Sequence, residues 1–221
     1  MQRALPYLFV IVSFLLGIAI GQVVDWAPTA VSSDDRWGAF ANSPKVELLG
    51  DGELLRLTED FAYVDPRGKM WVAKKDTLVN GASIPRVFWT IIGSPMRGKY
   101  RNAAIVHDEA CFSTTETWED SHKMFYEACR CGGVSEKKAK LMYAAVYHYG
   151  PRWELNKRLE TREHTEDGKT FSFQVAEYDS ESIETPEVSM EVCEKIKAFI
   201  ESENPSLDEI ENIDPKTWED N

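Results

Sequence analysis

Apolar residues recur at helical spacing in three consecutive segments in the middle of the chain. The second and third segments begin with Ser or Thr and end at Gly, which are residues typical of helix ends. The links between the segments are short, and this favours antiparallel packing of neighbouring helices. The pattern predicts a three-helix cluster, with helices over about Tyr100–Phe112, from a capping box at Ser113–Glu116 to about Cys131, and from Ser135 to Gly150.

Short segments rich in β-branched and aromatic residues precede these helices and show partial alternation. They cover Glu53–Leu57, Phe61–Val64 and Lys69–Ala73. Between the last two lies Asp65–Gly68, in which Pro and Gly are placed for a tight turn. The segments predict a small antiparallel β meander, so that residues 46–153 form an α+β domain.

An uninterrupted apolar stretch covers Ala4–Val24. Its 21 residues would form a helix of about 32 Å, enough to cross the hydrocarbon core of a bilayer. Arg3 precedes the stretch and Asp25 follows it, so the positive-inside rule places the bulk of the chain outside the cytoplasm. A cleaved signal peptide is the alternative, but the stretch is long for one and no small-x-small site follows it closely. We predict a single-pass signal anchor followed by a linker over residues 25–45.

The residues after Trp153 form a predicted extension, 154–221. Phe171–Tyr178 is an expected strand, and two helices are expected after caps at Thr185-Pro186 and Ser206. The first of these helices carries an apolar stripe, formed by Val188, Val192, Ile196, Phe199 and Ile200. Such a stripe usually packs on the parent domain, and the alternative is a protein partner. The last residues, DPKTWEDN, are expected to fray.

The charge of the chain is unevenly distributed. The net charge is −12, and from Thr161 onward 5 Lys or Arg residues stand against 18 Asp or Glu residues, a balance of −13. The first 160 residues therefore sum to +1. A face that binds nucleic acid needs clustered Lys and Arg, so this composition argues against nucleic acid as a partner.

Four cysteines are present, and an even count in an extracytoplasmic chain favours disulfides. Cys111 and Cys129 lie towards opposite ends of the predicted antiparallel helix pair, which disfavours a bridge between them. A bridge from Cys129 or Cys131 to Cys193 would attach the extension to the domain, and the connectivity stays open. A CxC zinc site at Cys129 and Cys131 would lack a second pair of ligands.

The adjacent pair His107-Asp108 lies on the first predicted helix, among mostly apolar residues. Burying an imidazole beside a carboxylate costs free energy, so such a pair indicates chemistry, a metal site or a buried hydrogen-bond network. Upstream, the string NGASIP at residues 80–85 predicts a turn in which Gly81 takes a positive φ and Ser83 bonds its own backbone.

The strings NGASIPRVFW, YRNAAIVHD and FYEACRCGGVSEKKAKLMYAAVYHYG, in this order, resemble the domain-of-unknown-function family 1353 of phages and bacteria. The resemblance covers about Leu54–Trp153. The family pattern combines a TDxASxPR turn with an AAxxHDxLY helix, and here Asn80 and Cys111 replace its Asp and Tyr. The family has no established activity, so the resemblance implies a fold rather than a function.

The HDxxC helix facing a second helix is also similar to the secreted phospholipase A-two type. That resemblance implies that His107 is a general base, that Asp108 holds calcium, and that a carboxylate on the second helix orients the imidazole. Here His122 stands in the place of that carboxylate, and no Gly-rich calcium loop is present. The candidate catalytic residues are therefore His107, Asp108 and His122.

The same three residues offer an N, O, N ligand set on facing helices, which zinc accepts. The resemblance to the phospholipase type implies calcium as the bound ion, whereas the nitrogen and oxygen donors of this set suit zinc. One function hypothesis is a membrane-anchored, non-catalytic envelope or phage-associated interaction domain in which the pair is a buried network. The other is a hydrolase, metal-assisted or not, that acts on lipid or cell-envelope material with His107 as general base. The missing carboxylates favour the first hypothesis.

Overall fold

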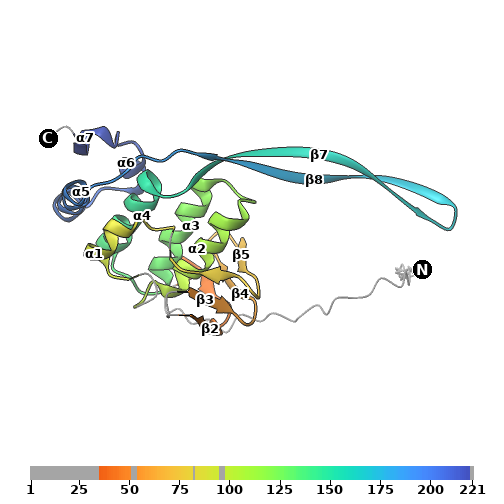
Figure 1. The fold of residues 1–221 in the computed structure, drawn as a ribbon, viewed down its shortest axis with the longest axis horizontal. Helices are drawn as coiled ribbons and strands as arrows, with labels where there is room; N and C mark the ends of the chain where they lie inside the picture. The colour runs from red at the N-terminus through yellow and green to blue at the C-terminus, as the bar shows by residue number, and fades with distance from the viewer. Residues whose placement is uncertain (1–34, 51–53, 82, 95–97, 220–221) are drawn as a thin grey trace, which may run out of the picture.

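The computed structural model describes residues 35–50, 54–81, 83–94 and 98–219 of the chain. The signal anchor predicted over Ala4–Val24 lies outside these ranges. None of the helices in the described ranges combines the length and the apolar character needed to cross a bilayer. The described part is an α+β structure, as predicted, in which small sheets and a helix cluster form a body and a long hairpin projects from it (Figure 1).

The strands that precede the helices form two antiparallel sheets, and the prediction of a single meander is wrong. One sheet has the order β1-β4-β5, with strands Ala39–Phe40, Phe61–Val64 and Met70–Ala73. The other has the order β2-β3-β6, with strands Val46–Leu49, Leu54–Leu57 and Leu78–Val79. The predicted turn at Asp65–Gly68 is confirmed, because it joins the paired strands β4 and β5.

Strand β3 pairs away from β4 because the backbone of its last residue is bonded elsewhere. The N–H of Leu57 donates to the Thr77 carbonyl at 3.0 Å, and its carbonyl accepts from the Asp76 N–H at 2.8 Å. Strand β1 comes from the stretch expected to be a linker, and its Phe40 stacks on Phe61 with ring centroids 5.6 Å apart. Strands of two and four residues show too little alternation to be recognised in the sequence.

The predicted three-helix cluster is confirmed. Its helices are α2 (Arg101–Ser113), α3 (Trp118–Cys131) and α4 (Glu136–Tyr149), and α3 contacts both of the others. The capping box predicted at Ser113–Glu116 is wrong, because Ser113 still belongs to α2. Instead, the Thr117 side chain caps α3 by accepting a hydrogen bond from the Asp120 N–H. The turn η2 (Arg86–Phe88) and the short helix α1 (Trp89–Ile92) precede the cluster.

A hairpin of two 15-residue strands follows α4, where only one strand was predicted. Strand β7 (Arg152–Glu166) pairs along its whole length with β8 (Lys169–Ile183). The connecting residues Asp167 and Gly168 have φ values of 50° and 72°, as a tight type I′ hairpin turn requires. At about 3.3 Å per residue the hairpin is about 50 Å long. It extends beyond the body as an arm (Figure 1).

The C-terminal helices return to the body. Helix α5 (Met190–Glu203) buries Val192, Ile196 and Ile200 and packs against α4, as its apolar stripe predicted. Its cap is Ser189 rather than Thr185-Pro186. The capping box at Ser206 is confirmed at the start of α6 (Leu207–Glu211).

The expected fraying of the last residues is wrong for α7 (Lys216–Glu219), because Trp218 is buried.

All four cysteines are free thiols, so neither of the bridges considered, from Cys129 or from Cys131 to Cys193, is present. The reason is the packing of the helices. Cys193 lies on α5, which packs against α4 and η2, whereas the Cys131 thiol on α3 contacts the Gly38 carbonyl at 3.4 Å, next to β1.

His148 ties α4 to the C-terminal helices and should make the fold sensitive to acid. Its Nε2–H donates to the Ile210 carbonyl at 2.8 Å, and its ring meets the Trp218 ring edge to face. Burial lowers the pKa of His148 to about 4, with Arg152 acting in the same direction and the Ile210 bond opposing it. Between the unfolded pKa of about 6.5 and this value, the unfolded chain binds the proton and the folded chain does not.

We therefore expect the melting temperature to fall as the pH is lowered from about 6.5 to about 4. The substitution His148→Gln keeps a side-chain N–H donor but cannot titrate, so its melting temperature should fall less over the same window. His164→Gln, in the exposed hairpin, is the matched control and should behave as the unmodified chain does. Equal pH profiles for all three proteins would show that His148 does not contribute. Thermal unfolding followed by circular dichroism measures the difference.

Candidate functional site

The carboxylate of Asp108 organises the NGAS turn. Its Oδ2 accepts the backbone N–H of Gly81 at 2.6 Å and that of Asn80 at 3.2 Å, and the Ser83 hydroxyl and N–H also bond to the carboxylate. Gly81 has a φ of 70°, a conformation that suits glycine. Burial raises the pKa of Asp108 and these donors oppose the rise. The carboxylate is thus used within the fold, to fix a turn 27 residues earlier in the chain.

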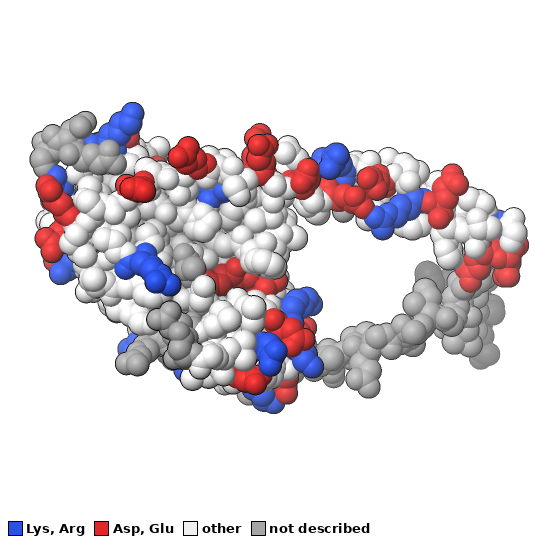
Figure 2. Space-filling model, in the orientation of Figure 1, with Lys and Arg blue, Asp and Glu red and all other residues white. Residues whose placement is uncertain are grey.

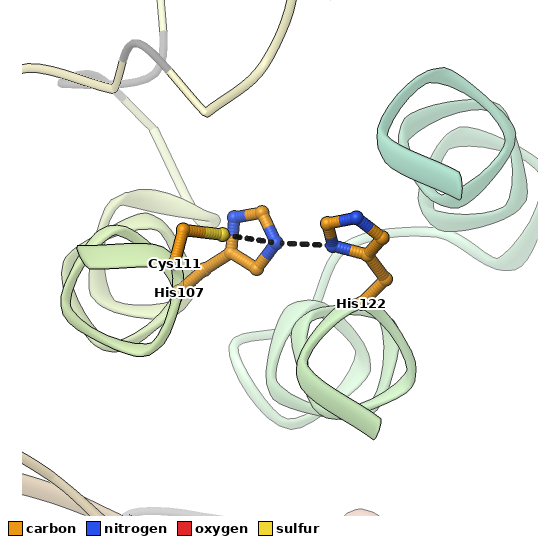
Figure 3. Close-up of side chains that lie close together, drawn as sticks. All are labelled: His107, Cys111 and His122. Atoms are coloured by element: carbon orange, nitrogen blue, oxygen red, sulfur yellow. Dashed lines mark hydrogen bonds between the residues drawn. The ribbon is translucent and has the colours of Figure 1, made fainter. Parts of the chain in front are cut away.

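The His107 side chain points towards the His122 ring on α3 (Figure 3). Its Nε2 lies 2.8 Å from Nδ1 of His122, and both rings are fully buried. Phe125 stacks on the His107 ring with centroids 4.5 Å apart. The hydrogen bond between the two imidazoles therefore joins α2 to α3 in an aromatic environment.

A backbone carbonyl fixes the protons of this pair. His122 Nε2 lies 3.0 Å from the Pro151 carbonyl oxygen, which can only accept, so His122 carries its proton on Nε2. In the neutral ring Nδ1 is then an acceptor, and His107 must donate to it from Nε2. His107 Nδ1 is left as a lone pair, and this buried atom has no hydrogen-bond partner.

Both histidines stay neutral because they are buried. Burial lowers the pKa of His122 to about 3, against the raising effect of its bond to Pro151. Burial, and then the neighbouring His122, lower the pKa of His107 well below its usual value. A general base must exchange protons with a substrate or with water. The fully buried His107 has its reachable nitrogen engaged with His122, so this geometry does not present it to a substrate.

Cys111 completes the group, and its role was not predicted from the sequence. It lies one helical turn after His107 on α2, and its Sγ is 3.6 Å from His107 Nε2 (Figure 3). Burial raises the pKa of the thiol to about 12, while the Ser83 hydroxyl bonds to the sulfur and opposes the rise. The available signal was the i,i+4 spacing of His107 and Cys111, which places both side chains on one helix face.

The structure brings together two of the three residues predicted as a site. His107 and His122 meet as expected, but Asp108 faces the NGAS turn instead of the ligand set. Within the described ranges, the donors that converge are His107 Nε2, His122 Nδ1 and Cys111 Sγ, all within 4.8 Å of one another. Asp120, two residues before His122 on α3, forms an ion pair with Arg67.

Residues 55–146 match the family described as "Protein of unknown function (DUF1353)". Over this segment the chain is similar to that family. The matched segment contains the NGAS turn, α2, α3 and most of α4. It therefore includes His107, Cys111 and His122. The β7–β8 hairpin and the C-terminal helices lie beyond it.

Two curated relatives are similar to this chain, the uncharacterized proteins y4jT and y4iH of Sinorhizobium fredii. The first is 36% identical over 147 residues, which are 66% of this chain and 43% of the relative. The second is 36% identical over 139 residues, which are 62% and 58% of the two proteins. The chain thus spans about half the length of the curated relatives that it matches. No solved structure matches the chain. These findings do not support the likeness to the phospholipase A-two type.

The Asp108 anchor can be tested by its effect on stability. Asp108→Ala leaves the buried Gly81 N–H without an acceptor, so the free energy of unfolding should fall by on the order of 3 kcal/mol. Asp108→Asn keeps one acceptor oxygen and should lose less. Glu194→Ala, which removes an exposed carboxylate from the middle of α5, should change the free energy by less than about 0.5 kcal/mol. Urea unfolding measures all three, and equal losses for Asp108→Ala and Glu194→Ala would contradict the anchoring role.

Proposed function

We propose that this protein is a membrane-anchored, non-catalytic interaction domain of the cell envelope or of a phage, and that its β7–β8 hairpin is the binding arm. The segment Ala4–Val24, predicted as an anchor, would hold the folded part on the extracytoplasmic side of a membrane. The body then serves as a rigid platform for the arm. The arm is the observation that carries the proposal.

The histidine site supports a non-catalytic function. Asp108 is committed to the NGAS turn, and His107 is fully buried with its Nε2 hydrogen bonded to His122. The hydrolase alternative needs His107 to contact a substrate or an attacking water. The same residues instead connect structural elements, because His122 holds Pro151 at the base of the arm.

The base of the arm is firmly fixed to the body. The Trp153 indole N–H donates to the Glu116 carbonyl at 2.8 Å, and Ser180 bonds to Thr114 at 2.6 Å. Beyond this base, the described strands β7 and β8 form a sheet of two strands only. Because an isolated two-stranded hairpin is marginally stable in water, its length favours a partner that covers it.

The two faces of the arm differ in charge. The side chains of a strand point alternately to its two faces. By the register of the hairpin, the odd-numbered residues of 153–165 share one face with the even-numbered residues of 170–182. Among these residues only Lys157 and Glu163 are charged, and the face exposes Leu159 and Tyr178. The opposite face carries the remaining charges of the arm together with Phe171 and Phe173. We call the first face the uncharged face.

Two ion pairs lie on the opposite face of the arm. Arg158 contacts Asp179 at 3.3 Å and Arg162 forms an ion pair with Glu177. Figure 2 shows both signs of charge spread along the hairpin. The carboxylates of Asp179 and Glu177 are neutralised in this way.

A second copy of the chain fits the uncharged face best. Two arms can approach each other through this face because most of the charged residues of each arm lie on its opposite face. Lys157 and Glu163 lie at equal distances from Glu160, the midpoint between them on β7. A twofold axis at that level, with the strands antiparallel, would place Lys157 of each copy opposite Glu163 of the other.

The test is the oligomeric state of the full chain in detergent micelles, measured by analytical ultracentrifugation over a range of concentrations. We expect a dimer. The reversals Lys157→Glu and Glu163→Lys should each raise the dissociation constant by on the order of tenfold, because like charges then face each other at two symmetric positions. The double variant K157E/E163K should restore the affinity of the unmodified chain.

A matched pair of variants separates the two faces. Leu159→Asp puts a new carboxylate on the uncharged face and should weaken the dimer. Asn156→Asp puts the same charge on the opposite face of the same strand and should not. A chain that is monomeric at every concentration, or a double variant no better than the single reversals, would overturn self-association. Association with a different protein through Leu159 would then have to replace it.

A further inference from the structure

Three side chains that differ from the predicted ligand set converge between α2 and α3. The donor atoms are two imidazole nitrogens and one thiol sulfur, supplied by His107, His122 and Cys111. Figure 3 shows the two residues of α2 pointing across to the ring on α3. Such a convergence of nitrogen and sulfur donors is the arrangement that zinc and related ions bind.

We propose that His107, Cys111 and His122 bind one divalent transition-metal ion, with zinc as the best-matched ion. The site would clamp α2 to α3 and is independent of the arm. It replaces Asp108, predicted as a ligand, with Cys111. Because the set lacks a carboxylate oxygen, it does not suit calcium, which takes oxygen ligands.

The three donor atoms lie within 4.8 Å of one another, and two of their separations can be compared with those of a tetrahedral site. Bonds of about 2.0 Å to nitrogen and about 2.3 Å to sulfur place a nitrogen and a sulfur about 3.6 Å apart and two nitrogens about 3.3 Å apart. The distance from Cys111 Sγ to His107 Nε2 is 3.6 Å, in agreement with the first value. The two nitrogens are now hydrogen bonded at 2.8 Å and would separate by about 0.5 Å, a small rotation of side chains.

The orientation of His122 is already that of a metal ligand. Its Nε2–H is held by the Pro151 carbonyl, which leaves the Nδ1 lone pair directed at the cluster. Histidine ligands commonly donate their second N–H to a backbone carbonyl in this way. His107 can present Nε2 by moving its proton to Nδ1, the buried nitrogen that lacks a hydrogen-bond partner.

The charge and the protons balance. Binding of a divalent ion displaces one proton, that of the Cys111 thiol, to solvent, and His107 keeps its proton on the other nitrogen. The ion and one thiolate leave a charge of +1 at the site, and the neighbouring carboxylate of Asp108 supplies the opposite charge. Cys111 is the partly exposed member of the group, so the ion and a fourth ligand from solvent can enter past it.

The experiment is a cobalt titration of the full chain in detergent micelles under reducing conditions. Bound Co²⁺ should show a thiolate-to-cobalt charge-transfer band in the near ultraviolet, saturate at one ion per chain, and be displaced by Zn²⁺. Cys111→Ser removes the sulfur with little change in shape, so the band should disappear and the Co²⁺ affinity should fall at least about 100-fold. Cys193→Ala, a buried thiol outside the cluster, is the matched control and should keep the band.

A second measurement guards against variants that unfold. Zn²⁺ should slow alkylation of Cys111 in the unmodified chain, as followed by mass spectrometry, and should raise its melting temperature. His122→Gln keeps a donor for Pro151 and an acceptor for His107 but has no imidazole, so it should fold, react at Cys111, and lose this protection. Weak cobalt binding without a thiolate band, unchanged in Cys111→Ser, would place the ion on the acidic C-terminal residues and overturn the proposal.

Discussion

The hydrogen bond between the imidazoles of His107 and His122 lies at the centre of a set of buried contacts that runs from the NGAS turn to Pro151. On the α2 side, the residue after His107 holds the NGAS turn through its carboxylate. On the α3 side, His122 holds the Pro151 carbonyl, where the chain leaves α4 for the arm. One buried network thus fixes the turn, the two helices and the start of the hairpin relative to one another.

The network depends on a single arrangement of protons. The Pro151 carbonyl determines the tautomer of His122, and His122 determines that of His107. Protonation of either ring would put a charge into a buried, aromatic environment, which costs free energy. The burial that keeps His107 from solvent also makes its hydrogen bond to His122 a stable connection between α2 and α3.

The sequence predicted the helices of the site but not how its side chains are used. His107 and His122 could be expected to meet because they lie on antiparallel helices with a short link. Asp108 could not be assigned, since its partner turn returns from 27 residues earlier. The hairpin was half missed although Asp167-Gly168 is a strong turn signal, because its β7 strand alternates charged with neutral residues rather than polar with apolar ones.

His122 is a ligand of the proposed metal site and also holds Pro151 at the base of the arm. The effect of a bound ion on the arm therefore depends on which atoms of His122 make each contact. A ligand shifts an equilibrium only by its difference in affinity for the two states. His122 would bind a metal through Nδ1, whereas it holds Pro151 through Nε2–H, and that bond is the same with or without the ion. The clamp would therefore strengthen the joint between α2 and α3 without moving the base of the arm. The body is stiffened at its centre while the uncharged face of the arm stays free for a second copy.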